Sequence, residues 1–188
     1  MKLTEPIRNR QQVREIIDYY LKRGQIRNHV LIVMGIFTAL RISDILRLCW
    51  DDVYDFKHNR VRIKVTITEK KTGKTKIIAL NAEIITALNR FINEARPGAF
   101  LFENKQTGKA ISRVQAYRLI RAAGEAVQIE PSVACHSLRK TYGYHSWKRG
   151  VKIEVLMKVY NHSSPAVTLR YIGVTQDDVD EAHLGLAF

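Results

Sequence analysis

A histidine and a tyrosine near the C-terminal end have a spacing that suits a reactive pair. His162 precedes Tyr171 by nine residues, and Arg41, Arg139 and a lysine-rich turn that starts at Lys70 lie upstream. A tyrosine can attack a phosphodiester only if its proton is removed, the charge on the phosphate oxygens is neutralised and the leaving oxygen receives a proton. The residue types present here meet those three requirements.

The arginines are candidates for binding the two non-bridging oxygens of one phosphate. Arg41 follows an apolar segment, and Arg139 lies three residues after His136, a spacing that places both on one helix face. Two guanidinium forks can hold one phosphate and stabilise the charge that builds in the transition state. His136 has an ordinary pKa near 6.5, which suits orientation of a group or proton transfer.

Each of these residues, taken alone, has an ordinary structural explanation. Arg41 is also typical of a helix-end arginine, and His136 with Arg139 of a surface pair on an amphipathic helix. His162 is also typical of a capping or core histidine. Tyr171 is one of eight tyrosines, most of which must be structural. The order and spacing of the whole set therefore carry more information than any member.

In that order the segments resemble the catalytic domain of the tyrosine recombinase (phage integrase) family, over about residues 7–186. The family has Thr-Gly-x-Arg-x-Ser-Glu around its first arginine, His-x-x-Arg at its second, and Gly-His-x-x before its nucleophile. This chain has Ala39, Asp44 and Asn161 where the family has glycine, glutamate and glycine. Asparagine tolerates the left-handed backbone nearly as well as glycine does.

The resemblance implies a role for each residue of the set. Tyr171 attacks the scissile phosphate, Arg41 and Arg139 clamp it, and His162 binds a non-bridging oxygen. Lys71, directly before Thr72-Gly73, matches the family's general acid for the leaving 5′ oxygen. The catalytic residues expected from the resemblance are Arg41, Lys71, His136, Arg139, His162 and Tyr171, with Asp44 in a supporting role.

The charge of the chain favours a polyanionic partner. Its 188 residues contain 31 Lys and Arg against 18 Asp and Glu, a formal charge of +13. No Lys or Arg follows Arg170, where four of the acidic residues lie. We therefore expect double-stranded DNA to bind mainly by electrostatic contacts. The expected DNA-binding residues are Lys70, Lys74, Lys76, Arg113 and Lys140.

The patterning predicts a mostly helical α+β domain. Val61, Ile63, Val65 and Ile67 alternate with polar residues, which predicts a strand with one buried face. With the return strand near residues 76–80, we expect one small antiparallel three-stranded sheet, as the family resemblance implies. Amphipathic or apolar patterns predict helices at about residues 9–22, 28–40, 43–48, 82–95, 112–127, 136–149, 153–160, 165–171 and 176–184.

No repeat or linker divides the sequence, so we expect one domain over residues 1–188, with a lead-in at 1–8 and a tail at 175–188. Many relatives carry a further helical domain in front. The chain is thus expected to be either a shortened form of such an enzyme or a single-domain recombinase. The resemblance also implies a tetramer on paired DNA sites, with tails exchanged between subunits and an accessory DNA-bending protein as a further candidate partner.

No cofactor or metal is expected. Cys49 and Cys135 form no disulfide or zinc pattern, and no cluster of Asp and Glu typical of two-metal nucleases is evident. The apolar segment at 30–40 is too short to span a bilayer, and residues 1–10 contain no signal-peptide core. We therefore expect a cytoplasmic, nucleoid-associated protein of bacterial or phage origin.

Three other functions remain compatible with the sequence. A type IB topoisomerase uses similar catalytic residues on one duplex and relaxes supercoils without recombining sites. A catalytically silent DNA-binding protein would bind in a salt-sensitive way and form no covalent adduct. An RNA-binding module fits the charge alone, although no RNP-type aromatic motif is present.

Overall fold

The structure, a computed structural model, describes residues 4–185, without the side chains of Val179 and Ala182. Its helices are α1 Arg10–Leu21, α2 Ile26–Phe37, α3 Ile42–Ile45, α4 Trp50–Val53, α5 Ala82–Phe91, α6 Arg113–Ala126, α7 Cys135–Lys148, α8 Ile153–Tyr160, α9 Pro165–Ile172 and α10 Gln176–Leu184, with a 3₁₀ turn at Ile92–Glu94. Its strands are β1 Tyr54–Asp55, β2 Arg60–Val61, β3 Lys64–Thr68 and β4 Thr75–Ala79. The expected mostly helical α+β character is confirmed.

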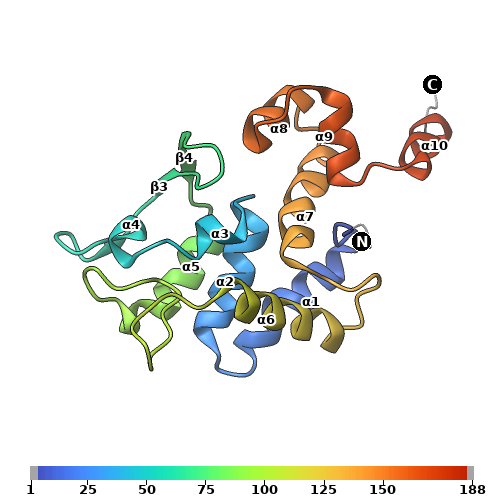
Figure 1. The fold of residues 1–188 in the computed structure, drawn as a ribbon. Coiled ribbons are helices and arrows are strands. Elements are labelled where there is room, and N and C mark those ends of the chain that lie inside the picture. Colours follow the sequence, from blue (N-terminus) through green and yellow to red (C-terminus); the bar gives the residue numbers. More distant parts are fainter. Residues whose placement is uncertain (1–3, 186–188) are drawn as a thin grey trace.

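Helix α2 forms the centre of the domain. It is apolar on nearly all sides, and every residue from position 28 to position 36 is buried. It packs against α1, α5 and α7, which surround it in Figure 1. Because α2 ends at Phe37, four residues before Arg41, its burial helps to fix the place from which that side chain extends.

The expected three-stranded sheet is wrong, because the structure has two separate two-stranded antiparallel sheets, β1 with β2 and β3 with β4. The alternating pattern predicted that Ile63 faces the core between Val61 and Val65. The chain bends at Ile63 instead, which leaves that side chain 70% exposed while Val61 and Val65 stay buried. The bend interrupts the strand, so β2 and β3 belong to different sheets.

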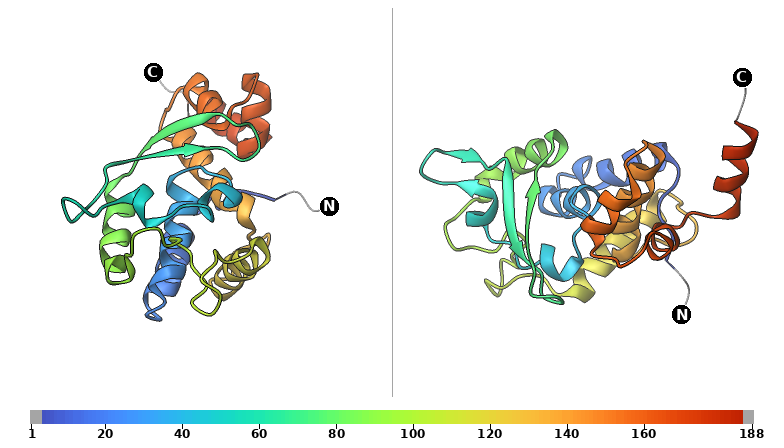
Figure 2. Two further views of the ribbon diagram at one scale, coloured as in Figure 1. Left: turned by 60° about the vertical axis from the view of Figure 1, so that its left-hand side comes forward. Right: turned by 90° about the horizontal axis from the view of Figure 1, so that it is seen from above.

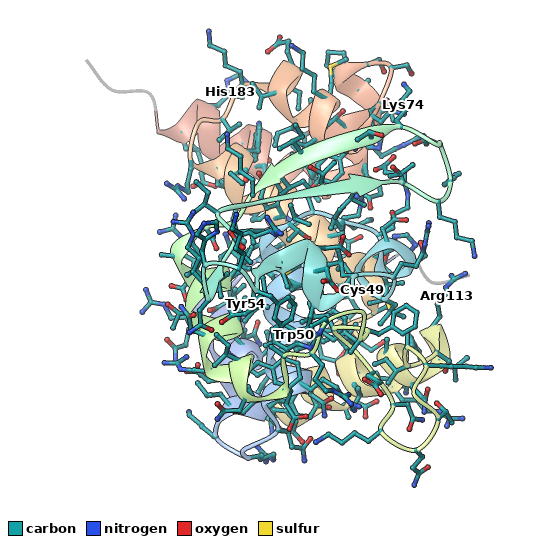
Figure 3. All side chains as sticks on the ribbon, turned by 90° about the vertical axis from the view of Figure 1, so that its left-hand side faces the viewer. Cys49, Trp50, Tyr54, Lys74, Arg113 and His183 are labelled. Carbon is teal, nitrogen blue, oxygen red and sulfur yellow. The ribbon has the colours of Figure 1, made fainter. Side chains whose placement is uncertain are left out.

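Strands β3 and β4 form a hairpin, residues 64–79, which we call the lysine hairpin. Its turn contains Gly73 at a φ of 67°, a left-handed conformation that glycine adopts without strain. Figure 2 (left) shows the hairpin running across the molecule toward α8 and α9. In Figure 3 Lys74 lies at the far end of the hairpin, close to these helices, and Trp50 and Tyr54 lie beneath the strands. The hairpin thus reaches from the main core to the C-terminal helices.

Helix α7 joins the main core to a smaller cluster built from α8 and α9 (Figure 1). The smaller cluster buries Ala39, Leu156, Tyr160 and Ile172. Gly143 of α7 permits the close approach of these helices, because a Cβ atom there would lie 2.5 Å from Cγ2 of Ile172. The α8–α9 cluster therefore packs directly against the backbone of α7 at Gly143.

Helix α10 is set off from the body in Figure 2 (right), yet its first turn is anchored to the same chain. The carboxylate of Asp178 is buried and accepts hydrogen bonds from the Tyr144 hydroxyl at 3.1 Å and the Thr175 backbone at 3.0 Å. Lys148 lies 2.9 Å from it. These contacts hold the pKa of Asp178 at about 2, against the opposing effect of burial, which is the largest single influence. At the other end of α10, Leu184 is 87% exposed.

No helix within residues 4–185 is both long enough and apolar enough to cross a membrane.

The packing at Gly143 generates a stability prediction. Gly143→Ala improves helix propensity by about 1 kcal/mol. The added methyl group meets Ile172 and the Tyr160 ring, whose Cε2 atom is 2.9 Å from the ideal Cβ position. Overpacking of this kind costs about 1–3 kcal/mol or more. We expect a net loss of unfolding free energy, measured by urea denaturation.

Gly35→Ala is the matched control, because Gly35 is also inside a helix and its added methyl meets the flexible end of Leu138. Since that side chain can change rotamer, we expect a smaller loss than at Gly143. A Gly143→Ala protein as stable as the wild type would show that α7 and the α8–α9 cluster are not closely packed.

Candidate active site

The first arginine is aimed by an unusual end to α2. Thr38 caps the helix and its hydroxyl donates to the Met34 carbonyl at 2.6 Å. Ala39 then takes a left-handed conformation with a φ of 54°, where the family has glycine. Arg41, in extended conformation, is the N-cap residue of α3. Because the chain reverses at Ala39, the Arg41 side chain leaves the helix toward the lysine hairpin.

The second arginine is buried at the same place. Arg139 of α7 is 3% exposed and donates a hydrogen bond to the Ala39 carbonyl oxygen. Its guanidinium carbon lies 4.8 Å from the centre of the Tyr160 ring, a cation–π contact. The backbone turn that positions Arg41 therefore also holds Arg139.

His162 lies in the turn between α8 and α9. Asn161 ends α8 with a φ of 59°, so the asparagine adopts the left-handed conformation expected of the family's glycine. The Nδ1 atom of His162 is 3.2 Å from the hydroxyl oxygen of Thr168, which itself donates to the Ser164 carbonyl. Since the hydroxyl proton is directed to Ser164, Nδ1 carries the imidazole proton and Nε2 is the free acceptor.

Tyr171, in the last turn of α9, lies beside this histidine. The centres of the two rings are 5.0 Å apart, and the ring planes are nearly perpendicular. The buried Tyr160 ring lies against both of them, with its centre 5.4 Å from the centre of the His162 ring and 5.1 Å from that of the Tyr171 ring. The Tyr160 hydroxyl donates to the Arg139 carbonyl, and burial raises its pKa. The Tyr160 hydroxyl is thus used in a buried structural hydrogen bond, whereas the Tyr171 side chain is only partly buried.

Desolvation and the nearby positive charges favour the neutral form of both histidines. Desolvation lowers the pKa of His162 most, and the positive charges of Arg139, Arg41 and Lys76 lower it further. Desolvation also leads the causes that lower the pKa of His136, followed by Arg139 and other cations. Arg139 and Arg41 are among the cations that lower the pKa of both rings.

Lys71 is the one expected catalytic residue outside this cluster among the described contacts. It is exposed in the turn of the lysine hairpin, as is Lys70. Lys74 donates to the side-chain oxygen of Asn161 at 2.8 Å, and Lys76 donates to the Val159 carbonyl at 2.8 Å. Two lysines therefore attach the hairpin to the end of α8, and Lys71 lies in the exposed turn next to the site.

The structure does not support the DNA contact expected for Lys140. Its side chain is buried, its ammonium donates to the Thr4 carbonyl at 2.5 Å, and it lies 5.5 Å from the Tyr171 ring centre. In the structure this ammonium is thus bound to the N-terminal segment and is not presented at the surface. Arg113, by contrast, is exposed at the start of α6, and its charge lowers the pKa of His136. Figure 3 shows Arg113 on the outside of that helix.

The sequence analysis missed Glu69, although a signal for it was present. Glu69 directly follows β3, continues the alternation of Val65 and Ile67, and is buried as they are. Its carboxylate lies 3.0 Å from Arg41 and 2.9 Å from Lys76. Asp44, expected in a supporting role, is buried and accepts from the Lys70 backbone at 2.9 Å. Both acids thus connect the lysine hairpin to the Arg41 segment.

Comparison with known proteins identifies the family. The model of the "Phage integrase family" matches residues 8–177, so this chain belongs to the phage integrase, or tyrosine recombinase, family. It is 37% identical to the "Probable integrase/recombinase YoeC" of Bacillus subtilis, over 97% of each chain. It is 24% identical to a "Tyrosine recombinase" of Thermosipho africanus, over 91% of this chain and 58% of that protein.

Solved structures show the same fold. XerA recombinase aligns with a TM-score of 0.79 at 18% identity, over 98% of this chain and 66% of that one. XerH recombinase, solved in a post-cleavage complex with a palindromic difH substrate, aligns with a TM-score of 0.76 at 19% identity, over 97% of this chain and 53% of that one. This chain therefore spans about half to two thirds of the length of these structures.

The cluster generates a prediction for the titration of His162. Because its pKa is lowered, we expect the ring to be neutral at pH 7 and to gain a proton only below the ordinary value of about 6.5. Lys76→Met removes one of the repelling charges and should raise the pKa. NMR titration of the imidazole protons measures both values.

Lys74→Met is the control, because it removes a lysine of the same hairpin that is not among the causes of the shift. It should leave the pKa of His162 unchanged. A wild-type value above 6.5, or equal effects of the two substitutions, would contradict the arrangement of charges described here. Since the unfolded chain binds this proton more readily than the folded one, acidification through pH 6.5 should also lower stability.

Proposed function

We propose that this chain cuts and rejoins double-stranded DNA at specific sites through a 3′-phosphotyrosyl intermediate. The observation that carries the proposal is the contact of Tyr171 with His162, in a place where the charges of Arg41 and Arg139 converge. The family membership and the names of the relatives support the same reaction. The relatives' names give no support to the topoisomerase alternative.

The proposed first step is attack by the Tyr171 oxygen on the scissile phosphorus. The phenol must lose its proton, and the neutral ring of His162, whose centre lies 5.0 Å from that of Tyr171, is the proposed acceptor. Arg41 and Arg139 bind the non-bridging oxygens and stabilise the charge that develops on them. When protonated, His162 becomes a donor and hydrogen-bonds a non-bridging oxygen.

The proposed leaving group is the 5′ oxygen of the DNA strand, which departs as the bond from phosphorus to tyrosine forms. Lys71 supplies the proton that converts this oxygen into a hydroxyl group, and His136 assists proton transfer within the cluster. The exposed hairpin turn lets Lys71 reach a bound DNA strand. The phosphotyrosyl bond conserves the energy of the cleaved bond, so a 5′ hydroxyl from another strand can reseal it by the reverse reaction.

The proposed working form is a tetramer on two DNA sites, in which the tail from residue 175 is exchanged between subunits. The exposed Leu184 on α10 supports exchange. In the structure α10 is held on its own chain by Asp178 and by the pairing of Glu181 with Lys148, so exchange would transfer these contacts to the same groups of a neighbour. Exposed Lys70, Lys74 and Arg113 are the proposed DNA-backbone contacts.

Tyr171→Phe should retain DNA binding and lose the covalent adduct, because the ring is kept while the nucleophilic oxygen is removed. A nicked suicide substrate made from the DNA that flanks the gene, followed by a denaturing gel, measures the adduct. Wild-type adduct should persist in EDTA, since no step in the proposed mechanism uses a metal.

Tyr160→Phe is the control, because Tyr160 is the neighbouring tyrosine and its hydroxyl is bound to the Arg139 carbonyl. We expect this variant to form the adduct. Adduct in Tyr171→Phe together with its loss in Tyr160→Phe would assign the nucleophile to Tyr160, and loss of wild-type adduct in EDTA would indicate a metal mechanism.

The role of Lys71 is testable by changing the leaving group. An alkoxide needs a proton as the bond breaks, whereas a thiolate leaves readily without one. A substrate with sulfur at the bridging 5′ position should therefore restore cleavage to Lys71→Ala by about 100-fold or more relative to the oxygen substrate. It should rescue Arg41→Ala much less, because Arg41 acts on the non-bridging oxygens.

Lys70→Ala is the matched control, because Lys70 is exposed in the same turn. We expect it to lose DNA affinity and to show no sulfur rescue. If Lys71→Ala cleaves the ordinary substrate at nearly the wild-type rate, or if sulfur rescues Lys70→Ala instead, Lys71 is not the general acid.

A further inference from the structure

Glu69 is the most deeply buried acid in contact with the proposed site. Its side chain is fully shielded from solvent in the structure, at 0% exposure. Oε1 lies 3.0 Å from Nη1 of Arg41 and 2.9 Å from Nζ of Lys76, and Oε2 accepts from the Thr72 hydroxyl at 2.7 Å. One carboxylate oxygen therefore serves two cations that come from different parts of the chain.

The electrostatics agree that Glu69 is ionised. Burial tends to raise its pKa, but hydrogen bonds from Lys76 and Thr72 and the charge of Lys76 lower the pKa to about 2. A buried carboxylate without such partners would cost several kcal/mol. Replacement of such a charge cluster by apolar residues is often neutral or stabilising. Stability alone is thus a weak reason for this arrangement.

The two cations remain available to a ligand. The side chains of Arg41 and Lys76 are 21% and 20% exposed, whereas that of Glu69 is fully shielded. Nη1 of Arg41, which pairs with Glu69 by charge, is itself shielded from solvent and has no hydrogen-bond partner, and the same holds for Oδ2 of the neighbouring Asp44. A ligand from solvent would therefore meet the exposed part of the Arg41 side chain and not Nη1.

We infer that Glu69 is a positioning residue for DNA cleavage, whose buried carboxylate holds the guanidinium of Arg41 and the ammonium of Lys76 side by side where the scissile phosphate binds. This inference rests on the proposed function. It also changes the role of Lys76, which the sequence suggested as a peripheral DNA contact. Lys76 shares the Glu69 carboxylate with Arg41 and donates to the Val159 carbonyl at 2.8 Å, so we place it at the phosphate site.

An alternative role for Glu69 would be competition with the phosphate for Arg41. The structure favours positioning, because the carboxylate is fully shielded from solvent while the side chains of Arg41 and Lys76 remain partly exposed. A phosphate arriving from solvent can bind Arg41 without displacing Glu69. The two roles predict opposite effects of neutralising the carboxylate.

The test is Glu69→Gln, which keeps the shape of the side chain and removes its charge. Single-turnover adduct formation on the nicked suicide substrate should slow about 10- to 100-fold, because a misplaced phosphate-binding group loses that much. DNA affinity should stay equal or become slightly stronger, because one negative charge is removed from a basic surface. Thermal unfolding shows whether the variant is folded under the assay conditions.

The matched control is Glu103→Gln. Glu103 is also a partly buried acid with an arginine partner, Arg96 at 2.5 Å, and none of its recorded ion pairs involves the site. We expect the same adduct rate as in the wild type. If Glu69→Gln does not fold, Lys76→Gln carries the test, with the same expected slowing of adduct formation at nearly unchanged DNA affinity.

A second substrate separates positioning from a general structural effect. With a methyl group in place of one non-bridging oxygen of the scissile phosphate, Arg41 has less to bind, so the deficit of Glu69→Gln should shrink several-fold. A deficit of equal size on both substrates, an unchanged rate, or a faster rate would each overturn the inference. Absence of adduct from the wild type would instead overturn the proposed function, and the inference with it.

Discussion

The concentration of positive charge at one place is the constraint on which the rest of the site depends. Desolvation lowers the pKa of His162 most, and the positive charges of Arg139, Arg41 and Lys76 lower it further. Cations so close to one another repel, and partial burial makes that repulsion stronger than in water. The folded chain must therefore supply compensating groups before any DNA is bound, and these groups determine much of the local structure.

Backbone carbonyls and an aromatic ring supply part of this compensation. Ala39 adopts a left-handed conformation that costs an ordinary residue about 1–2 kcal/mol. In return, its carbonyl oxygen accepts from Arg139, while the Tyr160 ring lies against the same guanidinium. The Val159 carbonyl does the same for Lys76. The strained turn at the end of α2 is thus explained by the hydrogen bond that its carbonyl oxygen accepts from Arg139.

The sequence predicted the helices and the identity of the site better than it predicted the sheet. The periodic pattern located α1 and α6. Their N-cap residues, Asn9 and Ser112, are local signals of the same kind. The resemblance selected Arg139, His162 and Tyr171, which the fold brings together. The break at Ile63 could not be predicted, because alternating residue types do not reveal where a strand bends.

The same limit applies to side chains whose roles depend on tertiary contacts. Lys70, Lys74 and Lys76 look alike in the sequence, yet Lys74 binds Asn161 and Lys76 binds Glu69. Lys140 is a basic residue of the kind that contacts DNA, yet its side chain is buried beside Tyr171. The local sequence around a charged residue does not show whether its side chain lies at the surface or binds a distant backbone carbonyl.

The arrangement also links proton transfer to the presence of substrate. In the DNA-free site, desolvation and the nearby cations lower the pKa of His162 and His136, so in the proposed mechanism both rings can accept a proton. A bound phosphate brings negative charge to the same cations and weakens their repulsion of a proton on either ring. The pKa of each ring then rises, and protonated His162 is stabilised as a donor to a phosphate oxygen. The charges that bind the phosphate therefore also make the proton transfers conditional on its binding.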